Sequence, residues 1–259
     1  MIDIINKHRA VLIEAVKMRL NELYAGSILG RMWAVLFPIL FLCIYLFVYL
    51  VVFKVRFPGL NTTGFVLYVF SGLLPYMSFM QVLNESTTLV RANLNLIRSV
   101  VLPIELISVR VVLTSLVSQL TSILFLLVLA YFYGKFTIEI LFLPVAIILN
   151  FMMLVGMSWL IAPIGYVLPD MSHVTNLVTL FLLFISPIAY THEQLNGLMK
   201  LVVFLNPIYY LLLPYRICFL PGIDYEIWQL AISVVLCISS FYFGARAFAQ
   251  AKKIMVDAV

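Results

Sequence analysis

The chain has 259 residues, of which 64% are apolar and only 10% are charged. A soluble globular domain is about half apolar and a quarter charged, so this composition excludes an ordinary soluble domain and indicates a protein embedded in lipid. The formal net charge of +5 is small, and it indicates basic loops on one side of a membrane better than a nucleic-acid-binding surface.

Residues 1–30 carry an amphipathic pattern. Apolar residues recur at helical spacings, with charged and polar residues between them: Ile5, Leu12, Val16, Leu20 and Leu23 alternate with Lys7, Lys17, Asn21 and Glu22. The segment is too charged to span a bilayer, so the pattern predicts an interfacial helix on the membrane surface. An ordinary helix packed on protein is the alternative.

Six apolar, charge-free runs follow, at residues 33–53, 65–84, 111–133, 140–168, 174–190 and 227–245. A helix needs about 20 such residues to cross a bilayer. The predicted fold class is therefore an all-α integral membrane protein with six transmembrane helices. Pro144 and Pro163 should trim or kink the fourth helix.

The segment 198–220 is apolar enough to be a seventh span. However, Asn206, Pro207 and Pro214 interrupt it, and Lys200 and Arg216 lie within it. We therefore expect two short re-entrant helices that dip into the outer half of the membrane. With six spans and both termini inside, 11 Lys and Arg residues fall in inner segments and 5 in outer segments. This bias obeys the positive-inside rule, and a seventh span would abolish it.

Titratable groups are missing from the interior of the six runs. Ion-coupled transporters place such groups inside the membrane, so the sequence disfavours ion-driven transport. The histidines (His8, His173 and His192) lie at helix ends or in loops, and no motif of a hydrolase or a phosphate-binding loop occurs. The cysteines (Cys43, Cys218 and Cys237) have no metal-site spacing, and we expect small core residues there. Any transport energy must therefore come from a partner.

Several short motifs occur in a characteristic order. They are residues 24–33, with Pro38 after them, then 71–76, 93–98, 102–105, Pro169-Asp170, 186–190, 206–208 and Tyr215-Arg216. Their order and spacing resemble the membrane subunit of ATP-binding-cassette exporters for bacterial surface polysaccharides, a family that includes the O-antigen, capsule and teichoic acid permeases. One departure is Tyr76, where the family usually has Trp after Gly-Leu-Leu-Pro.

The resemblance implies one permease domain over residues 1–259, working as a homodimer in the bacterial inner membrane with both termini cytoplasmic. Two separate ATPase subunits would bind ATP and Mg²⁺, so this chain would need no cofactor and would not be an enzyme. The cargo would be a lipid-linked polysaccharide, most simply O-antigen on a lipid such as undecaprenyl diphosphate. Residues 84–110 would form the cytoplasmic coupling loop and 191–226 the periplasmic gate.

Other functions stay open at this stage. A permease of the same family could export a drug or another lipid. A membrane-embedded polysaccharide-modifying enzyme is a further alternative, which the lack of a catalytic base disfavours. A passive structural membrane protein would have no ATPase partner.

Candidate functional residues fall into three groups. Aromatic residues at intervals of four in the first span (Phe37, Phe41, Tyr45, Tyr49 and Phe53) could let a glycan slide by stacking on sugar rings, or could simply pack other helices. Ser118 and Ser122, with Thr114, Ser115 and Gln119 nearby, could line a hydrated channel or serve helix packing. Both groups are expected along the substrate pathway.

The third group is expected on the cytoplasmic side of the membrane. By the resemblance, Arg91, Asn93, Leu96, Ile97 and Arg98 belong to the segment that docks on the ATPase, where a short amphipathic helix would enter a groove on the partner. Arg31 could contact the lipid diphosphate, or equally the headgroups of anionic phospholipids.

Overall fold

A computed structural model describes residues 2–52, 54, 61–94, 103–190, 195–220 and 225–257. For residues 2–6, 31 and 253–257 it describes the backbone alone. All regular secondary structure in these ranges is helical, and five helices are long and apolar enough to cross a membrane, or six if one bent pair counts as a span. The predicted all-α integral membrane fold is confirmed.

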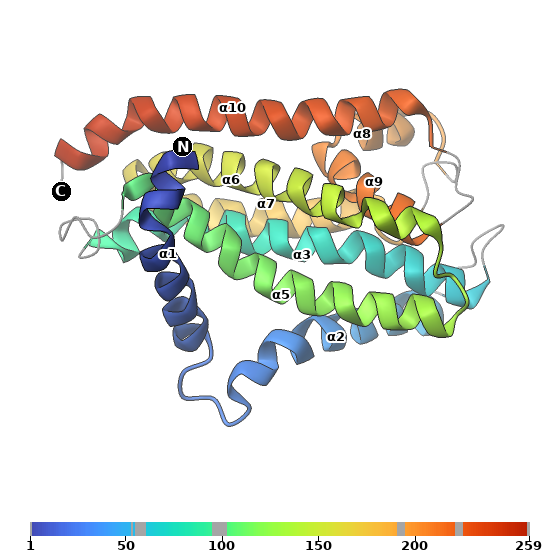
Figure 1. Ribbon diagram of the computed structural model, residues 1–259. Helices are drawn as coiled ribbons and strands as arrows, with labels where there is room; N and C mark the ends of the chain where they lie inside the picture. Colours follow the sequence, from blue (N-terminus) through green and yellow to red (C-terminus); the bar gives the residue numbers. More distant parts are fainter. Residues whose placement is uncertain are drawn as a thin grey trace.

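The elements follow the chain in this order: α1 (Ile2–Leu23), η1 (Gly30–Met32), α2 (Trp33–Leu46), its π-helical continuation η2 (Phe47–Val52), α3 (Thr62–Ala92), α5 (Ile104–Phe132), η3 (Ile138–Phe142), α6 (Leu143–Val167), α7 (Met171–Ile185), α8 (Leu198–Leu205), α9 (Pro207–Phe219) and α10 (Ile227–Asp257). In Figure 1 the long helices run side by side, while α1 crosses them at one end. We call that end, where α3 and α10 finish, the terminal end. The other end, where α8 and α9 lie, is the distal end.

Helix bounds differ from the charge-free runs mainly at the terminal end. The third predicted span starts at Ile104 instead of residue 111, and the second continues to Ala92. Charged residues do not stop a helix once it leaves the bilayer, so both ends of the predicted loop 84–110 belong to helices α3 and α5. The fifth span ends at Ile185, before Pro187, because the residue preceding a proline disfavours the helical conformation.

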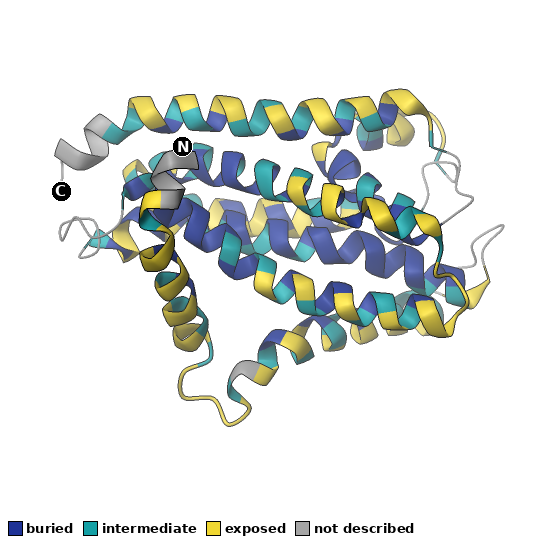
Figure 2. Cartoon of the chain, in the orientation of Figure 1, coloured by how far each residue is buried: buried dark blue, intermediate teal, exposed yellow. Residues whose placement is uncertain are grey.

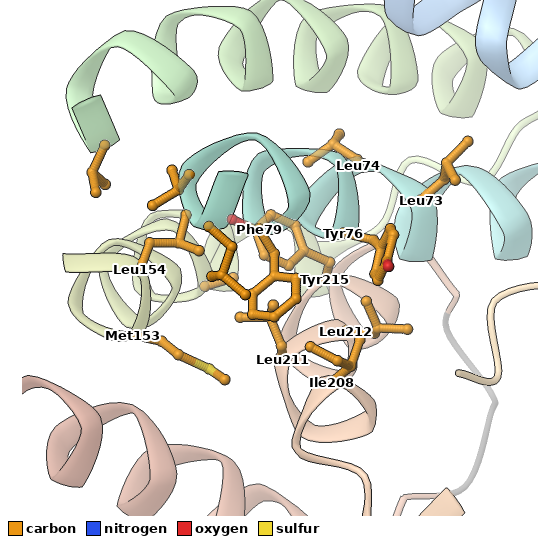
Figure 3. Packing of buried hydrophobic residues seen from close by; sticks show 14 of the residues in the cluster. Leu73, Leu74, Tyr76, Phe79, Met153, Leu154, Ile208, Leu211, Leu212 and Tyr215 are labelled. Carbon is orange, nitrogen blue, oxygen red and sulfur yellow. The ribbon is translucent and has the colours of Figure 1, made fainter. Parts of the chain in front are cut away.

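The core is centred on α3, which Figure 2 shows as buried along most of its length. Helices α5, α6, α7 and α9 surround it. Figure 3 shows side chains of three of these helices meeting at one place: Leu73, Leu74, Tyr76 and Phe79 of α3, Met153 and Leu154 of α6, and Ile208, Leu211, Leu212 and Tyr215 of α9.

Glycines let the central helices approach one another. A Cβ on Gly156 of α6 would lie 2.3 Å from the Ser240 backbone of α10, and one on Gly244 would lie 2.3 Å from the Gly156 carbonyl oxygen. A Cβ on Gly165 would lie 2.1 Å from the Thr87 carbonyl oxygen of α3. Close approach at small residues is how membrane helices gain van der Waals contact when lipid supplies no hydrophobic drive between them.

The N-terminal helix packs on protein along one face. Leu12 and Val16 are buried, and α1 contacts α5. Arg19 forms an ion pair with Glu85 of α3 at 3.2 Å. The opposite face, with Ile13 and Met18, is exposed. The packing alternative therefore holds for the face with Leu12 and Val16, whereas contact of the exposed face with the membrane surface stays a prediction.

The bent pair lies at the distal end. Helices α8 and α9 meet at an angle of 77°, and α10 begins beside them. Asn206 lies at the bend, where its side chain accepts a hydrogen bond of 2.9 Å from the Ile208 amide and so caps α9. The two short re-entrant helices expected before the last span match this arrangement.

Two expectations need correction. Arg110 in α5 and Arg216 in α9 are buried, so the bundle does hold charged side chains in its interior. Arg110 directly precedes the third charge-free run, and Arg216 lies in the segment 198–220, which was expected to form short outer helices. Among the cysteines, Cys218 and Cys237 are buried as expected, whereas Cys43 is exposed on α2.

Candidate functional site: a groove between α2, α3 and α5

A groove of about 390 Å³ opens between the turn after α1 and helices α2, α3 and α5. It is lined by apolar and hydroxyl-bearing residues: Leu23, Tyr24, Ser27, Trp33, Ala34, Phe37, Pro38, Leu74, Met77, Ser78, Met80, Gln81, Ser115, Ser118, Gln119 and Ser122. Membrane proteins place binding sites in such concave surfaces between helices. The groove is our candidate functional site.

Helix α5 supplies one polar wall. Ser115, Ser118, Gln119 and Ser122 recur at helical intervals of three and four, so they share one face. The Ser115 hydroxyl donates to the Val112 carbonyl at 2.8 Å, and the Ser122 hydroxyl to the Ser118 carbonyl at 3.1 Å. Each hydroxyl oxygen keeps lone pairs that can accept hydrogen bonds from a ligand.

Helices α2 and α3 supply the apolar wall. Trp33, Phe37 and Pro38 come from α2, and Leu74 and Met77 from α3. Aromatic faces opposite hydroxyl groups can hold a ligand that has both apolar C–H faces and hydroxyl edges, as sugars have. The groove thus unites Phe37, Ser118 and Ser122, which the sequence assigned to the substrate pathway.

The aromatic residues of α2 form a continuous line. Ring centroids of Phe37 and Phe41 are 6.2 Å apart, those of Phe41 and Tyr45 6.4 Å, and those of Tyr45 and Tyr49 4.7 Å, all stacked. Exposure falls from 53% at Phe37 to 8% at Tyr45, so the line passes from the groove into the protein core. The predicted fifth member, Phe53, lies outside the described residues.

Thr114 does not reach the groove. Its side chain is fully buried, and its hydroxyl donates to the Arg110 carbonyl at 2.9 Å. Thr121 lies on the side of α5 next to α2 and contacts the Ala34 carbonyl at 3.3 Å. Helix packing is thus the role of these two hydroxyls, whereas Ser118 and Ser122 face the groove.

A buried polar network lies behind the groove. The Gln119 amide donates to the Tyr215 hydroxyl at 2.8 Å, and the Asn150 amide donates to the Gln119 carbonyl oxygen at 3.0 Å. Asn150 also contacts the Tyr215 hydroxyl at 3.2 Å, so α5, α6 and α9 are joined. The sequence signal for this network was an asparagine in the middle of the fourth apolar run, which our sequence reasoning did not use.

The basic coupling residues are only partly described. The Arg91 guanidinium donates to the Tyr166 carbonyl at 2.6 Å, which ties the end of α3 to the end of α6. Asn93 is buried, and its side-chain amide oxygen accepts a hydrogen bond of 2.8 Å from the Arg110 guanidinium. Leu96, Ile97 and Arg98 lie outside the described residues, as does the Arg31 side chain, although the Arg31 backbone lies in η1 at the entrance to α2.

No cluster of three or more His, Cys, Asp or Glu residues that could hold a metal ion occurs in the described part of the chain. The groove therefore offers hydrogen bonds, aromatic faces and apolar surface. These groups can bind a ligand and let it move.

Two comparisons with known proteins bear on this site. The model of the family described as ABC-2 type transporter matches residues 12–220, which include every wall of the groove. The O-antigen export system permease protein RfbA of Myxococcus xanthus is 28% identical over 238 residues, covering 89% of each chain.

Proposed function

The chain belongs to the ABC-2 type transporter family, and from that premise we propose that it exports a lipid-linked polysaccharide, with O-antigen as the cargo. It is a multi-pass membrane protein and a transport permease. The observation that carries the choice of cargo is the groove, which is lined both by serine side chains and by the rings of Trp33 and Phe37. The similarity to a protein named for O-antigen export supports the same choice.

The shape of the site suits a polymer better than a small drug. Phe37 lines the groove and begins the line of stacked rings, in which Phe41 and Tyr49 are half-buried and Tyr45 is buried. Weak, repeated stacking and hydrogen bonding let a long glycan move without one tight site. A compact drug would gain more from an enclosed pocket.

We further propose that a second copy of the chain completes the pathway, and that two ATPase subunits bind ATP and Mg²⁺ and drive it. The terminal end would then face the cytoplasm of the bacterial cell, placing the chain in the inner membrane. The distribution of basic residues supports this orientation. Basic residues gather at the terminal end (Arg91, Arg110, Arg246 and Lys252), and cytoplasmic segments of membrane proteins are rich in Lys and Arg.

Deleting the gene and analysing its glycans tests the cargo. We expect loss of surface polysaccharide together with accumulation of lipid-linked glycan inside the cell, and the wild-type gene on a plasmid should reverse both. Normal surface polysaccharide in the deletion strain would overturn the proposal. A matching loss of resistance to a toxic compound would indicate a drug as cargo.

The coupling segment has its own test. Replacing Leu96 and Ile97 together by Asp should abolish co-purification of the ATPase, because carboxylates cannot enter an apolar groove on a partner without a large desolvation cost. The matched control is Leu198→Asp, an exposed residue of α8 at the distal end, which should leave the ATPase bound. Normal co-purification of the Leu96 and Ile97 variant would contradict the assignment.

Arg31 is proposed to contact the lipid diphosphate at the entrance to α2. Arg31→Ala should weaken binding of undecaprenyl diphosphate to the purified permease in vesicles that contain only neutral phospholipid. Unchanged affinity would remove this role.

A further inference from the structure

The re-entrant pair contains one deeply buried cation. Arg216 of α9 is only 2% exposed, and none of the ion pairs in the described part of the chain involves it. Its guanidinium donates to the Pro187 carbonyl and lies 3.9 Å from the centre of the Tyr68 ring. An arginine in this position is held by a carbonyl dipole and by the negative face of an aromatic ring.

The partners of Arg216 are themselves fixed. The Tyr68 hydroxyl of α3 donates to the Tyr190 carbonyl at 3.0 Å and contacts the Pro187 carbonyl at 3.4 Å. Residues 186–189, which follow α7, are buried. One arginine and one tyrosine thus join α3, the segment after α7 and α9, and we call these contacts the Arg216 clamp.

Gly72 of α3 makes the space that the clamp needs. A Cβ at this position would lie 3.2 Å from a terminal nitrogen of the Arg216 guanidinium. Moving the guanidinium away from the carbonyl and the ring would leave a charge without partners in a medium of low dielectric constant, which is costly. The clamp therefore fixes α9 to α3.

The two halves of the re-entrant pair differ sharply. Ten residues of α9 are buried, whereas Val203 is the one buried residue of α8. Leu198, Met199, Leu201 and Leu205 of α8 are more than half exposed. Helix α8 has few neighbours in the protein: it contacts the start of α9, and near its end Val203 and Phe204 pack against α10, where the Phe204 and Trp228 ring centroids are 5.8 Å apart. A short helix with so little buried surface opens locally at low cost.

The junctions of α8 suit a hinge. Gly197, at its start, has φ +60°, a conformation that other residues adopt rarely. Asn206, which follows the end of α8, is held in place because its side-chain amide donates a hydrogen bond of 2.9 Å to the Ser186 hydroxyl. Movement of α8 about these two points would leave the Arg216 clamp intact.

We propose that α8 alone is the moving lid of the distal gate, and that Arg216 is the positioning residue that holds α9 as its fixed frame. This inference rests on the proposed function, in which the terminal end faces the cytoplasm. An exported cargo would then leave the permease at the distal end. The inference goes beyond that proposal by dividing the gate into a moving and a fixed half.

Hydrogen–deuterium exchange of the full-length permease in lipid nanodiscs tests the division. Amides of α8 should exchange at least tenfold faster than those of α9 in the wild-type protein. Arg216→Gln should speed exchange of α9 at least tenfold, while α6 and α10 stay protected. Lys200→Gln removes the same charge from exposed α8, and as the matched control it should change nothing in α9.

Two further variants keep the test decisive if Arg216→Gln does not fold. Tyr68→Phe keeps the ring but loses the hydroxyl, so it should speed α9 exchange by a smaller factor. Arg216→Lys keeps the charge but not the planar group, and it should restore protection in part. Equal exchange of α8 and α9 in the wild-type protein, or unchanged α9 exchange in both Arg216→Gln and Tyr68→Phe, would overturn the proposal.

The outcome is separable from the question of cargo, because exchange is measured without any substrate. If the deletion strain kept its surface polysaccharide but the exchange pattern appeared, the cargo assignment would fall and the fixed frame would stand. If instead the deletion strain lost its surface polysaccharide but α8 and α9 exchanged equally, the lid proposal would fall and the cargo assignment would stand.

Discussion

Helices α2 and α3 are neighbours in sequence, yet they occupy opposite environments. Of the most apolar stretch of each, 17% is buried in α2 but 78% in α3. The more apolar helix is the exposed one, because α2 has the higher mean hydropathy of the two. Figure 2 shows the same contrast between α2, on which exposed, intermediate and buried residues are mixed, and the dark central α3.

The contrast teaches that the mean hydropathy of a helix in this protein does not indicate how deeply the helix is buried. Lipid is as apolar as a leucine side chain, so apolar residues gain nothing by leaving it. Small and polar residues gain contact and hydrogen bonds when they meet another helix. Accordingly, Ser71, Ser78, Ser86 and Thr87 of α3 are buried, and the Ser86 hydroxyl bonds to that of Ser158 at 2.8 Å.

The largest effect is expected where α3 meets α6. Gly165→Ala would place a Cβ 2.1 Å from the Thr87 carbonyl oxygen, and a backbone atom cannot move aside as a flexible side chain can. We expect a loss of about 3 kcal/mol or more in the free energy of unfolding. Unfolding in mixed micelles, followed by circular dichroism, measures it.

The control for Gly165→Ala lies on α2. Ile44 is 64% exposed, so Ile44→Ala should leave the free energy of unfolding almost unchanged despite losing three carbon atoms. Equal destabilisation by both variants would break the comparison between the helices.

The buried amide network should give the next largest effect. Gln119→Leu removes two hydrogen bonds and leaves the Tyr215 hydroxyl with the 3.2 Å hydrogen bond from the Asn150 amide. Hydrogen bonds between membrane helices contribute about 0.6 kcal/mol each, with a maximum near 1.7 kcal/mol. We therefore expect a loss of about 1 to 2 kcal/mol in the free energy of unfolding.

A double-mutant cycle of Gln119→Leu and Tyr215→Phe isolates the network from general packing. A coupling energy of about 1 kcal/mol is expected for side chains in direct contact. Strict additivity of the two variants would show that the contact contributes nothing.

The sequence predicted the type and approximate position of the five long spanning helices, because the bilayer demands long apolar runs with internally paired backbones. The fifth predicted span was the exception, because α7 has only 15 residues and is too short to cross a bilayer as a straight helix. The sequence also predicted the re-entrant pair α8 and α9, since Asn206 and Pro207 indicate the end of one helix and the start of the next. The ends of α3, α5 and α10 were less predictable, because charged residues outside the bilayer neither favour nor stop a helix strongly.

The site was harder to predict than the fold. Helical spacing grouped Ser118 with Ser122, and Phe37 with Tyr45, but it could not reveal that α2 and α5 face each other across a groove. The pairing of distant helices depends on shape and on hydrogen bonds such as Asn150 to Gln119. The burial of Arg216 was unforeseen for the same reason, because its partners Tyr68 and Pro187 are far away in sequence.

Transport tests the functional side of the comparison. If α2 guides a glycan, the double variant Tyr45→Ala and Tyr49→Ala should reduce surface polysaccharide several-fold. The reason is that two of the stacked rings are lost, and each ring contact contributes about 1 kcal/mol. Quantifying surface and lipid-linked glycan in the complemented deletion strain measures it. Expression and ATPase binding should stay normal.

The matched control for the tyrosines is Phe47→Ala. It removes an aromatic ring from the same helix, but Phe47 is 58% exposed and lies outside the stacked line. Unchanged export in the tyrosine variant, or an equal loss in the control, would assign the rings to packing or to lipid contact.

The smallest effect is expected at the terminal end, where solvent replaces lipid. Lys252 of α10 lies 2.6 Å from Glu105 of α5, but its side chain is 42% exposed. Water and salt screen such a pair, so Lys252→Gln should cost about 0.5 kcal/mol or less at physiological ionic strength. A loss as large as that of Gln119→Leu, measured by the same unfolding assay, would mean that the terminal end is as shielded from water as the middle of the bundle. The charged ends of α5 and α10 would then count among the buried parts of the protein, together with α3.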